Sequence, residues 1–221
     1  MSHQQFDRLL EQVRARCLSM AAMVQQAVAL ACDAITRLDV DAARKAVAAE
    51  ERIDEEDVEV ERQAINLMIL HHPSATDFRA VFGIVKINAN LERIGDCAAS
   101  VAEQARRVAA AGIEVPREVK QIAEAALKQV QLTVQCLGSM DPDLAQEVSR
   151  ADDAVDALNS QIQLDRQTAM ERDRASVPGN VALLVAAKYF ERIGDNCVNI
   201  AEDVVYLMRG EIVRHTHDPN R

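Results

Sequence analysis

The sequence predicts an all-α protein of two tandem three-helix bundles, with six long antiparallel helices related by an internal repeat. Its 221 residues include no Trp, two Tyr and four Phe, although 49% are hydrophobic, so the core is aliphatic and suits helices packed on helices. Only seven Gly and five Pro interrupt the chain, which indicates long elements. The second half repeats the pattern of the first, which places the bundles in residues 1–111 and 112–221.

Helical periodicity and helix-ending signals define the six elements. Apolar residues recur at steps of three and four over residues 6–38, the spacing of one helix face. Asp39 and Asp141 are suitable N-caps for the second and fifth helices, and Pro142 suits a first helical position. Pro73 ends the second helix. We therefore expect the other five helices over about 39–70, 76–110, 116–137, 142–174 and from a turn at 176–179 to about 213.

The repeat is visible residue by residue. The sequence Glu-Arg-Ile-Gly-Asp occupies residues 92–96 and again 191–195, an offset of 99. Earlier in each half the offset is 102, so the second copy is three residues shorter, and the turn between its last two helices can absorb the difference. The acids related by 102 are Asp39, Asp41, Glu50, Glu51 and Asp54 with Asp141, Asp143, Asp152, Asp153 and Asp156.

These acids are predicted to meet between neighbouring helices. Residues four apart, such as Glu92 and Asp96, share one helix face. Asp54 lies about 20 residues before the turn and Asp96 about 22 after it, so an antiparallel hairpin brings them to one level at about 1.5 Å per residue. The same holds in the second copy. The candidate metal ligands are therefore Glu92, Asp96, Glu191, Asp195, Asp54, Asp156, Glu51 and Asp153.

Carboxylates held this close must take up protons or a cation. An all-oxygen set suits Mg, Mn, Ca or Fe, and no His lies within these faces to favour zinc or copper. The chain contains no Glu-x-x-His, the spacing of ferritin-like di-iron ligands. The alternative is a solvated acidic face without a ligand. Gly95 and Gly194, which destabilise a helix interior by up to about 1 kcal/mol each, indicate close helix approach and favour cation binding.

Composition and motifs exclude several function classes. The net charge of −10 and the lack of a dense basic stretch argue against nucleic-acid binding. Five cysteines without a CxxC spacing favour free core thiols in a reducing compartment. Without a signal-peptide layout or a run of about 20 apolar residues, we expect a cytoplasmic protein that meets a membrane only through partners. No phosphate-binding Gly loop, nucleophile elbow or Ser/His/Asp set indicates an enzyme.

Through the motifs at residues 91–96 and 190–195, the chain resembles the PhoU family of phosphate-uptake regulators, and the resemblance covers nearly its whole length. Residues 51–54 and the turn at 73–79 also match the family pattern. The resemblance implies a homodimer of two-bundle chains that hold divalent or iron ions, singly or as a multinuclear cluster, with Fe, Mn, Mg and Zn all open. Glu92, Asp96, Glu191 and Asp195 match the family's metal motif.

The resemblance also sets the functional expectation. It implies a negative regulator of phosphate uptake and of the phosphate-starvation response, an adaptor between the ATPase of the Pst phosphate ABC transporter and a PhoR-type sensor kinase. Cys97 and Asn196 follow the motif Asp where the family often has His, so the two sites are expected to differ in metal content or affinity. Two alternatives are an accessory module of another phosphate transporter and a metal-dependent phosphohydrolase.

Overall fold

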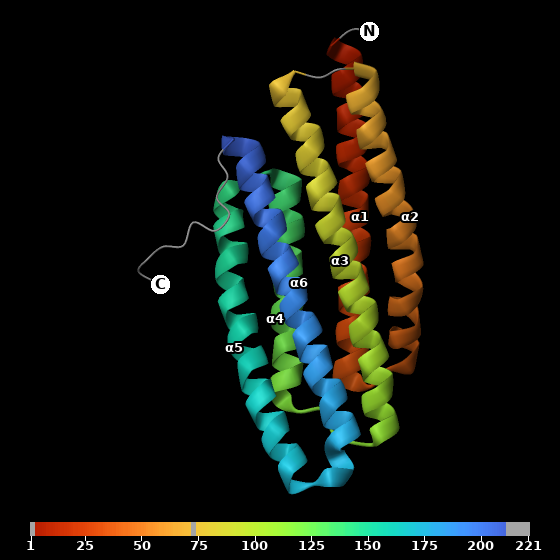
Figure 1. The fold of residues 1–221 in the computed structure, drawn as a ribbon, viewed down its shortest axis with the longest axis vertical. Coiled ribbons are helices and arrows are strands. Elements are labelled where there is room, and N and C mark those ends of the chain that lie inside the picture. The colour runs from red at the N-terminus through yellow and green to blue at the C-terminus, as the bar shows by residue number, and fades with distance from the viewer. Residues whose placement is uncertain (1–2, 72–73, 211–221) are drawn as a thin grey trace.

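The computed structural model describes residues 3–71 and 74–210, which form six long helices in two bundles that lie side by side (Figure 1). The first bundle contains α1 (His3–Arg37), α2 (Val40–His71) and α3 (Ala75–Ala111). The second contains α4 (Arg117–Ser139), α5 (Pro142–Arg172) and α6 (Val177–Arg209), with a short 3-10 turn, η1 (Arg174–Ser176), before α6. The predicted all-α fold of six helices is confirmed. The division into folding units at residue 111 stays a prediction.

The predicted N-caps are confirmed at both equivalent positions. The Asp39 carboxylate accepts from the backbone N–H of Asp41 at 2.9 Å, and Asp141 accepts from that of Asp143 at 2.9 Å. Leu38 and Met140, which precede these caps, have positive φ angles of 54° and 53°. Because each pair is 102 residues apart, the repeat extends from the residue types to the backbone conformation.

The turn between α5 and α6 differs from the prediction. Val177 begins α6, so Pro178 and Gly179 lie in its first turn, where a proline is compatible with helix geometry. The chain reverses at η1 instead, where Asp173 accepts from the backbone N–H of Ala175 at 2.9 Å. The helix ends at Arg209 because Gly210 adopts a left-handed φ of 72°. The predicted end near residue 213 lies outside the described residues.

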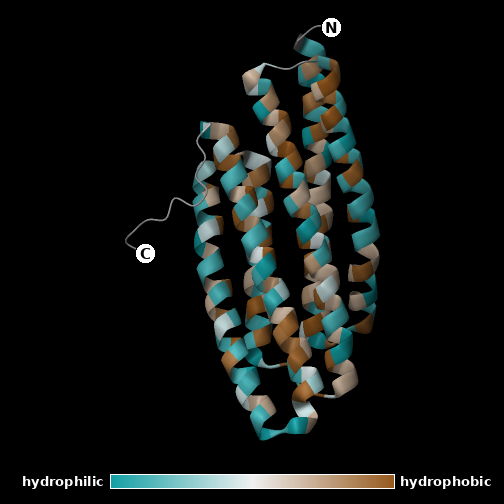
Figure 2. Cartoon of the chain, in the orientation of Figure 1, coloured by the Kyte–Doolittle hydropathy of each residue, from teal (hydrophilic) through white to brown (hydrophobic). Residues whose placement is uncertain are grey.

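Helix α1 supplies the buried stripe that its periodicity predicts. Val13, Met20, Val24 and Ile35 are each at most 2% exposed, and α1 contacts α2, α3 and α4. By length and composition, Gln4–Arg37 could also cross a membrane, which corrects the expectation that no stretch is apolar enough. Half of the most apolar window is buried inside the protein, as a core helix requires. Apolar and polar residues alternate around the helices (Figure 2).

The two bundles meet chiefly through α3 and α6. A partly buried ion pair crosses this contact, where the half-buried Lys86 donates to the carboxylate of Asp203, which is 1% exposed. The Lys86 ammonium also lies 5.6 Å from the centre of the Tyr206 ring. Gly83 gives Leu207 room to pack closely on α3. Apolar contact and one partly desolvated charge pair therefore hold the repeats together.

Both glycines of the repeated motif lie at close helix approaches, as predicted. A Cβ atom on Gly95 would lie 3.1 Å from side-chain carbons of Ile53 in α2. A Cβ atom on Gly194 would lie 2.5 Å from Oδ1 of Asp152 and 2.9 Å from Oε1 of Gln129. Glycine thus permits each motif helix to approach the preceding helix of its own bundle.

Replacement of Gly194 by Ala is expected to lower the free energy of unfolding by roughly 1–2 kcal/mol. Overpacking costs about 1–3 kcal/mol, and the better helix propensity of alanine returns up to about 1 kcal/mol. Urea unfolding followed by circular dichroism measures the change. The control is Gly138→Ala in α4, where a Cβ atom would meet nothing within 4 Å. The control should be neutral or stabilising, and equal losses in both variants would contradict this explanation.

The Asp203→Ala variant is expected to be less stable by about 2–3 kcal/mol, because it leaves the Lys86 charge partly buried without this carboxylate. The double variant Lys86→Met/Asp203→Leu should regain most of that stability, since apolar residues can replace a buried ion pair. Denaturant unfolding of the parent, the single and the double variants gives the comparison. A double variant no more stable than Asp203→Ala would show that the cost is lost packing.

Candidate metal centre

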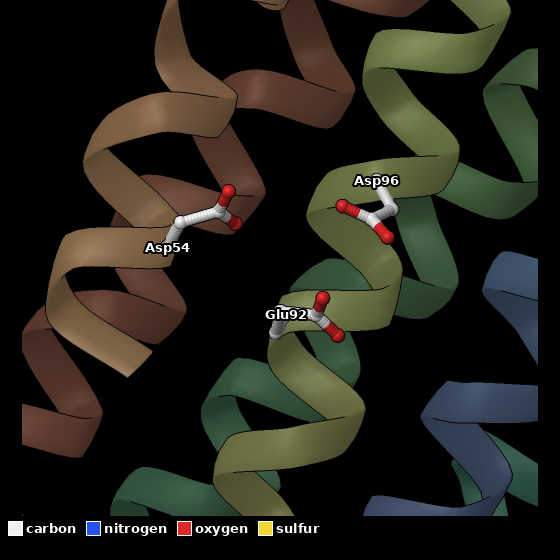
Figure 3. Close-up of side chains that lie close together, drawn as sticks. All are labelled: Asp54, Glu92 and Asp96. Atoms are coloured by element: carbon white, nitrogen blue, oxygen red, sulfur yellow. The ribbon is translucent and has the colours of Figure 1, made fainter. Parts of the chain in front are cut away.

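Three carboxylates of the first repeat converge between α2 and α3. Asp54 comes from α2, and Glu92 and Asp96 come from α3 (Figure 3). One oxygen of each lies within 4.8 Å of the others. We call these three residues the first acidic cluster. The prediction that the hairpin brings Asp54 level with the motif acids is therefore correct.

The first acidic cluster fits a hard divalent cation. Oxygen ligands lie at about 2.3–2.6 Å from Ca²⁺ and about 2.0–2.1 Å from Mg²⁺, so ligands on opposite sides of an ion are roughly 4–5 Å apart. The spacing of up to 4.8 Å therefore admits a common ion with only small side-chain rotations. Asp54 and Asp96 are exposed and Glu92 is half-buried, so water can complete the coordination.

The convergence of carboxylates in the first acidic cluster contributes to a raised pKa of two of its members, Glu92 and Asp96. Burial raises the pKa of Glu92, the carboxylates of Asp96, Asp57 and Asp54 raise it further, and Arg93 opposes them. Burial and then Asp54 raise the pKa of Asp96. Each carboxylate therefore binds a proton more readily than it would alone, and a cation would relieve the same repulsion.

Two further acids flank the first acidic cluster, and one predicted ligand does not join it. Burial, followed by Asp96 and Asp54, raises the pKa of Glu50. Burial, followed by Glu61 and Asp54, raises that of Asp57. Glu51 is exposed and is not among the residues whose oxygens converge. The signal that could have found Glu50 and Asp57 is the 4–3 spacing of residues 50, 54 and 57, which defines one helix face.

The second repeat contains a related group of acids on α5 and α6, although among the described residues only the first acidic cluster has carboxylate oxygens that converge within 4.8 Å. We call Asp152, Asp153, Asp156, Glu191 and Asp195 the second acidic cluster. Burial raises the pKa of Asp156, with Glu191 and Asp153 adding to the rise. Burial, then Glu191 and Asp156, raises the pKa of Asp195. The four ligands predicted in this repeat are therefore electrostatic neighbours, and Asp152 joins them.

A lysine lies against the second acidic cluster. The Nζ atom of Lys188 is 2.6 Å from Oε1 and 2.5 Å from Oε2 of Glu191. Its charge also opposes the rise in the pKa of Asp156 and of Asp195. Sequence reasoning did not include Lys188, although its position three residues before Glu191 places both on one helix face.

Asp152 is the most deeply placed acid of the second acidic cluster. The fully buried Gln129 of α4 donates from Nε2 to Oδ1 of Asp152 at 3.1 Å and to the carbonyl of Gly194 at 3.3 Å. Burial raises the pKa of Asp152 to about 6 despite this hydrogen bond, and nearby carboxylates add to the rise. Gln129 lies far from the motif in sequence, so only the packing of α4 against α5 and α6 identifies it.

Arg192 links the electrostatics of the two repeats. It opposes the rise in the pKa of Asp96 in the first acidic cluster and of Asp195 in the second. Its guanidinium carbon lies 5.8 Å from the centre of the Tyr189 ring. The charge of Arg192 therefore acts on acids of both repeats.

The fold and the two acidic clusters define a class of duplicated three-helix-bundle proteins with carboxylates gathered between the second and third helix of each repeat. The family model described as the PhoU domain matches residues 17–105 and again residues 119–204. The chain therefore belongs to the PhoU family. Each match spans most of one repeat, so the family assignment applies to both bundles.

Similar proteins agree with this assignment. The chain is 33% identical over 215 residues to a Pseudomonas aeruginosa protein named phosphate-specific transport system accessory protein PhoU homolog, which covers 96% of this chain and 88% of that protein. An Aquifex aeolicus protein of the same name is 33% identical over 209 residues, with 94% and 95% covered. The Escherichia coli phosphate-specific transport system accessory protein PhoU is 28% identical over 212 residues, with 96% and 88% covered.

Solved structures extend the agreement to three dimensions. The crystal structure of PhoU from Pseudomonas aeruginosa aligns with a TM-score of 0.89 at 32% identity, covering 93% of this chain and all of that chain. PhoU from Streptococcus pneumoniae, titled a phosphate transport system regulatory protein, aligns with a TM-score of 0.86 at 22% identity, over 94% and 99% of the two chains. The latter similarity supports the fold alone.

The stability of the metal-free protein is expected to fall as the pH rises from about 4 to about 6. The folded-state pKa of Asp152 is raised from 3.8 to about 6, so its stabilising proton is bound below pH 4 and lost above pH 6. Thermal unfolding in chelator across this range gives the profile. Asp152→Asn keeps an acceptor for Gln129 and should flatten the slope and unfold at a higher temperature than the parent at pH 7. An unchanged slope would contradict this.

Proposed function

We propose that this protein is a negative regulator of phosphate uptake and of the phosphate-starvation response, a metal-binding adaptor between the Pst transporter ATPase and a PhoR-type sensor kinase. The observation that carries the proposal is the match of the PhoU domain to both repeats. The Pseudomonas aeruginosa relative, whose name makes it an accessory protein of phosphate-specific transport, supports it across 96% of the chain. An accessory protein acts through contacts with the transport machinery, which agrees with an adaptor role.

The first acidic cluster is the part of the proposal that concerns metal. Asp54, Glu92 and Asp96 would hold the ion, since they offer only oxygen ligands within 4.8 Å of one another. Such a set favours Mg, Mn or Fe, singly or in a cluster, over zinc. A bound ion supplies positive charge between α2 and α3. The residues themselves orient the ion and transmit its presence to the α2–α3 packing, because each helix contributes at least one ligand.

A regulatory role without catalysis and a cytoplasmic location belong to the same proposal. A cavity of about 340 Å³ lies between α1 and α2, and Leu9, Val13 and Leu67 are among its lining residues, none of which belongs to either acidic cluster. All five cysteines are free and buried, which agrees with a reducing compartment. We further propose that the protein is a homodimer and that it reaches the membrane only through its partners.

Substitution in the first acidic cluster is expected to remove both metal and regulation. Glu92→Gln/Asp96→Asn keeps the side-chain shapes and removes two negative charges. In a host that lacks its own copy, the parent should restore repression of a phosphate-starvation reporter at high phosphate, and the variant should fail to do so. Elemental analysis after dialysis should find metal in the parent and at least about tenfold less in the variant, because two of three charged ligands are gone.

The control is Asp165→Asn/Glu171→Gln, which removes two exposed acids of α5 and should behave as the parent does. Equal helicity by circular dichroism shows that the variants fold. If the parent contains no metal and still represses the reporter, the metal-binding part of the proposal is wrong and the adaptor part stands. A parent that fails to repress, or that hydrolyses a phosphate ester in a metal-dependent way, would overturn the regulatory assignment.

A further inference from the structure

The two repeats differ in basic charge at a position just before the motif acids. Lys188 precedes the motif of the second repeat by three residues, and Ala89 occupies the equivalent position, 99 residues earlier, in the first. The Lys188 ammonium contacts both oxygens of Glu191, at 2.6 and 2.5 Å. The Ala89 side chain carries no charge. The second repeat therefore has a covalently attached cation at a position where the first repeat has none.

The ammonium acts on more than one member of the second acidic cluster. Lys188 opposes the rise in the pKa of Asp156, which burial, Glu191 and Asp153 produce. It does the same for Asp195, together with Arg192. One positive charge thus lies within interaction range of carboxylates from both α5 and α6.

The first acidic cluster has weaker compensation from within the protein. Across residues 3–71 and 74–210, no ion pair closer than 4.0 Å involves Asp54, Glu92 or Asp96. The basic residues that act on these acids are Arg93 and Arg192. Both are exposed, as Lys188 is, but within the described residues neither is paired with these carboxylates as Lys188 is with Glu191. The same three carboxylates are the ones whose oxygens converge within 4.8 Å. Their repulsion is left for an external cation to neutralise.

We propose that Lys188 is the resident counter-ion of the second acidic cluster. The packing of α5 on α6 in the second repeat then needs no metal, whereas the packing of α2 on α3 in the first repeat depends on a bound divalent cation. The inference rests on the proposed function for the metal at the first acidic cluster. A metal ion entering the second acidic cluster must displace or repel an ammonium that already contacts Glu191, which lowers its affinity. The duplicated motif therefore produces one metal-dependent and one metal-independent repeat.

Exchanging the residue types of positions 89 and 188 between the repeats tests this proposal, with Mn²⁺ as the probe. Calorimetric titration of the chelator-treated parent should detect sites that Glu92→Gln/Asp96→Asn removes and that Glu191→Gln/Asp195→Asn leaves unchanged. Lys188→Ala should add a second class of sites, with affinity raised on the order of 10–100-fold over the same cluster in the parent, the effect expected of one neighbouring charge. Glu191→Gln/Asp195→Asn should remove these added sites. Ala89→Lys should abolish the first class.

The counter-ion role also has a readout that needs no metal in the parent. In chelator, Lys188→Ala should unfold at a lower temperature than the parent, and Mn²⁺ should restore the loss. Lys188→Arg keeps the charge and should resemble the parent in both measurements. Lys120→Ala removes an exposed lysine of α4, nine residues before Gln129, and controls for a change in net charge. Circular dichroism confirms that each variant remains helical.

The possible outcomes separate the two proposals. If the parent binds Mn²⁺ equally at both clusters, or if Lys188→Ala changes neither Mn²⁺ binding nor stability in chelator, the role of Lys188 is overturned and the metal-binding adaptor stands. If the parent binds no Mn²⁺ at the first acidic cluster, the metal half of the proposed function is overturned. Loss of stability in Lys188→Ala under chelator would still support the counter-ion in that case.

Discussion

Carboxylates accumulate in this protein where two helices of a bundle approach most closely, and the rest of the structure must balance their repulsion. Gly95 and Gly194 permit the approach, because a side chain at either position would press on the facing helix. In the first repeat, a carboxylate oxygen of Asp54 on the facing helix then lies within 4.8 Å of oxygens of the motif acids Glu92 and Asp96. Burial and mutual repulsion raise the pKa of Asp96, of Asp195 and of several of their neighbours. Apolar packing elsewhere in each bundle must supply the stability that this arrangement costs.

The two repeats compensate the repulsion between their carboxylates in different ways. In the second repeat Lys188 contacts Glu191, and Gln129 anchors Asp152 at the base of the cluster. In the first repeat the corresponding positions are Ala89 and Ala27, which bring neither charge nor a hydrogen bond. The overall architecture tolerates this divergence because each cluster lies within its own bundle. The two bundles are connected by the long side chain of Arg192 and by the contacts of α3 with α6 and of α1 with α4.

The two helices that carry the motif acids, α3 and α6, contact each other. The motif helices are the ones that join the bundles, so a shift of α3 against α2 also changes the surface that α3 offers to α6. The partly buried Lys86–Asp203 pair and the packing of Leu207 on Gly83 hold this surface in one register. A change in the α2–α3 contact would therefore also change the contact between the two bundles.

Much of the fold follows from local chemistry that the sequence alone reveals. The 3.6-residue period of apolar side chains determined the helices, Asp39 and Asp141 determined two helix starts, and the constant offsets determined the duplication. Hairpin geometry placed Asp54 level with Asp96, because rise per residue is nearly constant in any α-helix. These properties depend on the backbone and on sequence spacing, so no tertiary information was needed.

Only the tertiary structure decided which acids face one another and what compensates them. Successive residues on a helix point about 100° apart, so the rotation of α2 about its own axis decides whether Glu50 or Glu51 lies beside the cluster. The packing of Ile53 against Gly95 belongs to the contact that fixes this rotation. The participation of Gln129 and the reach of Arg192 across the repeats depend on contacts between helices far apart in the chain. Sequence spacing contains no information about such contacts, because they follow from packing of the whole core.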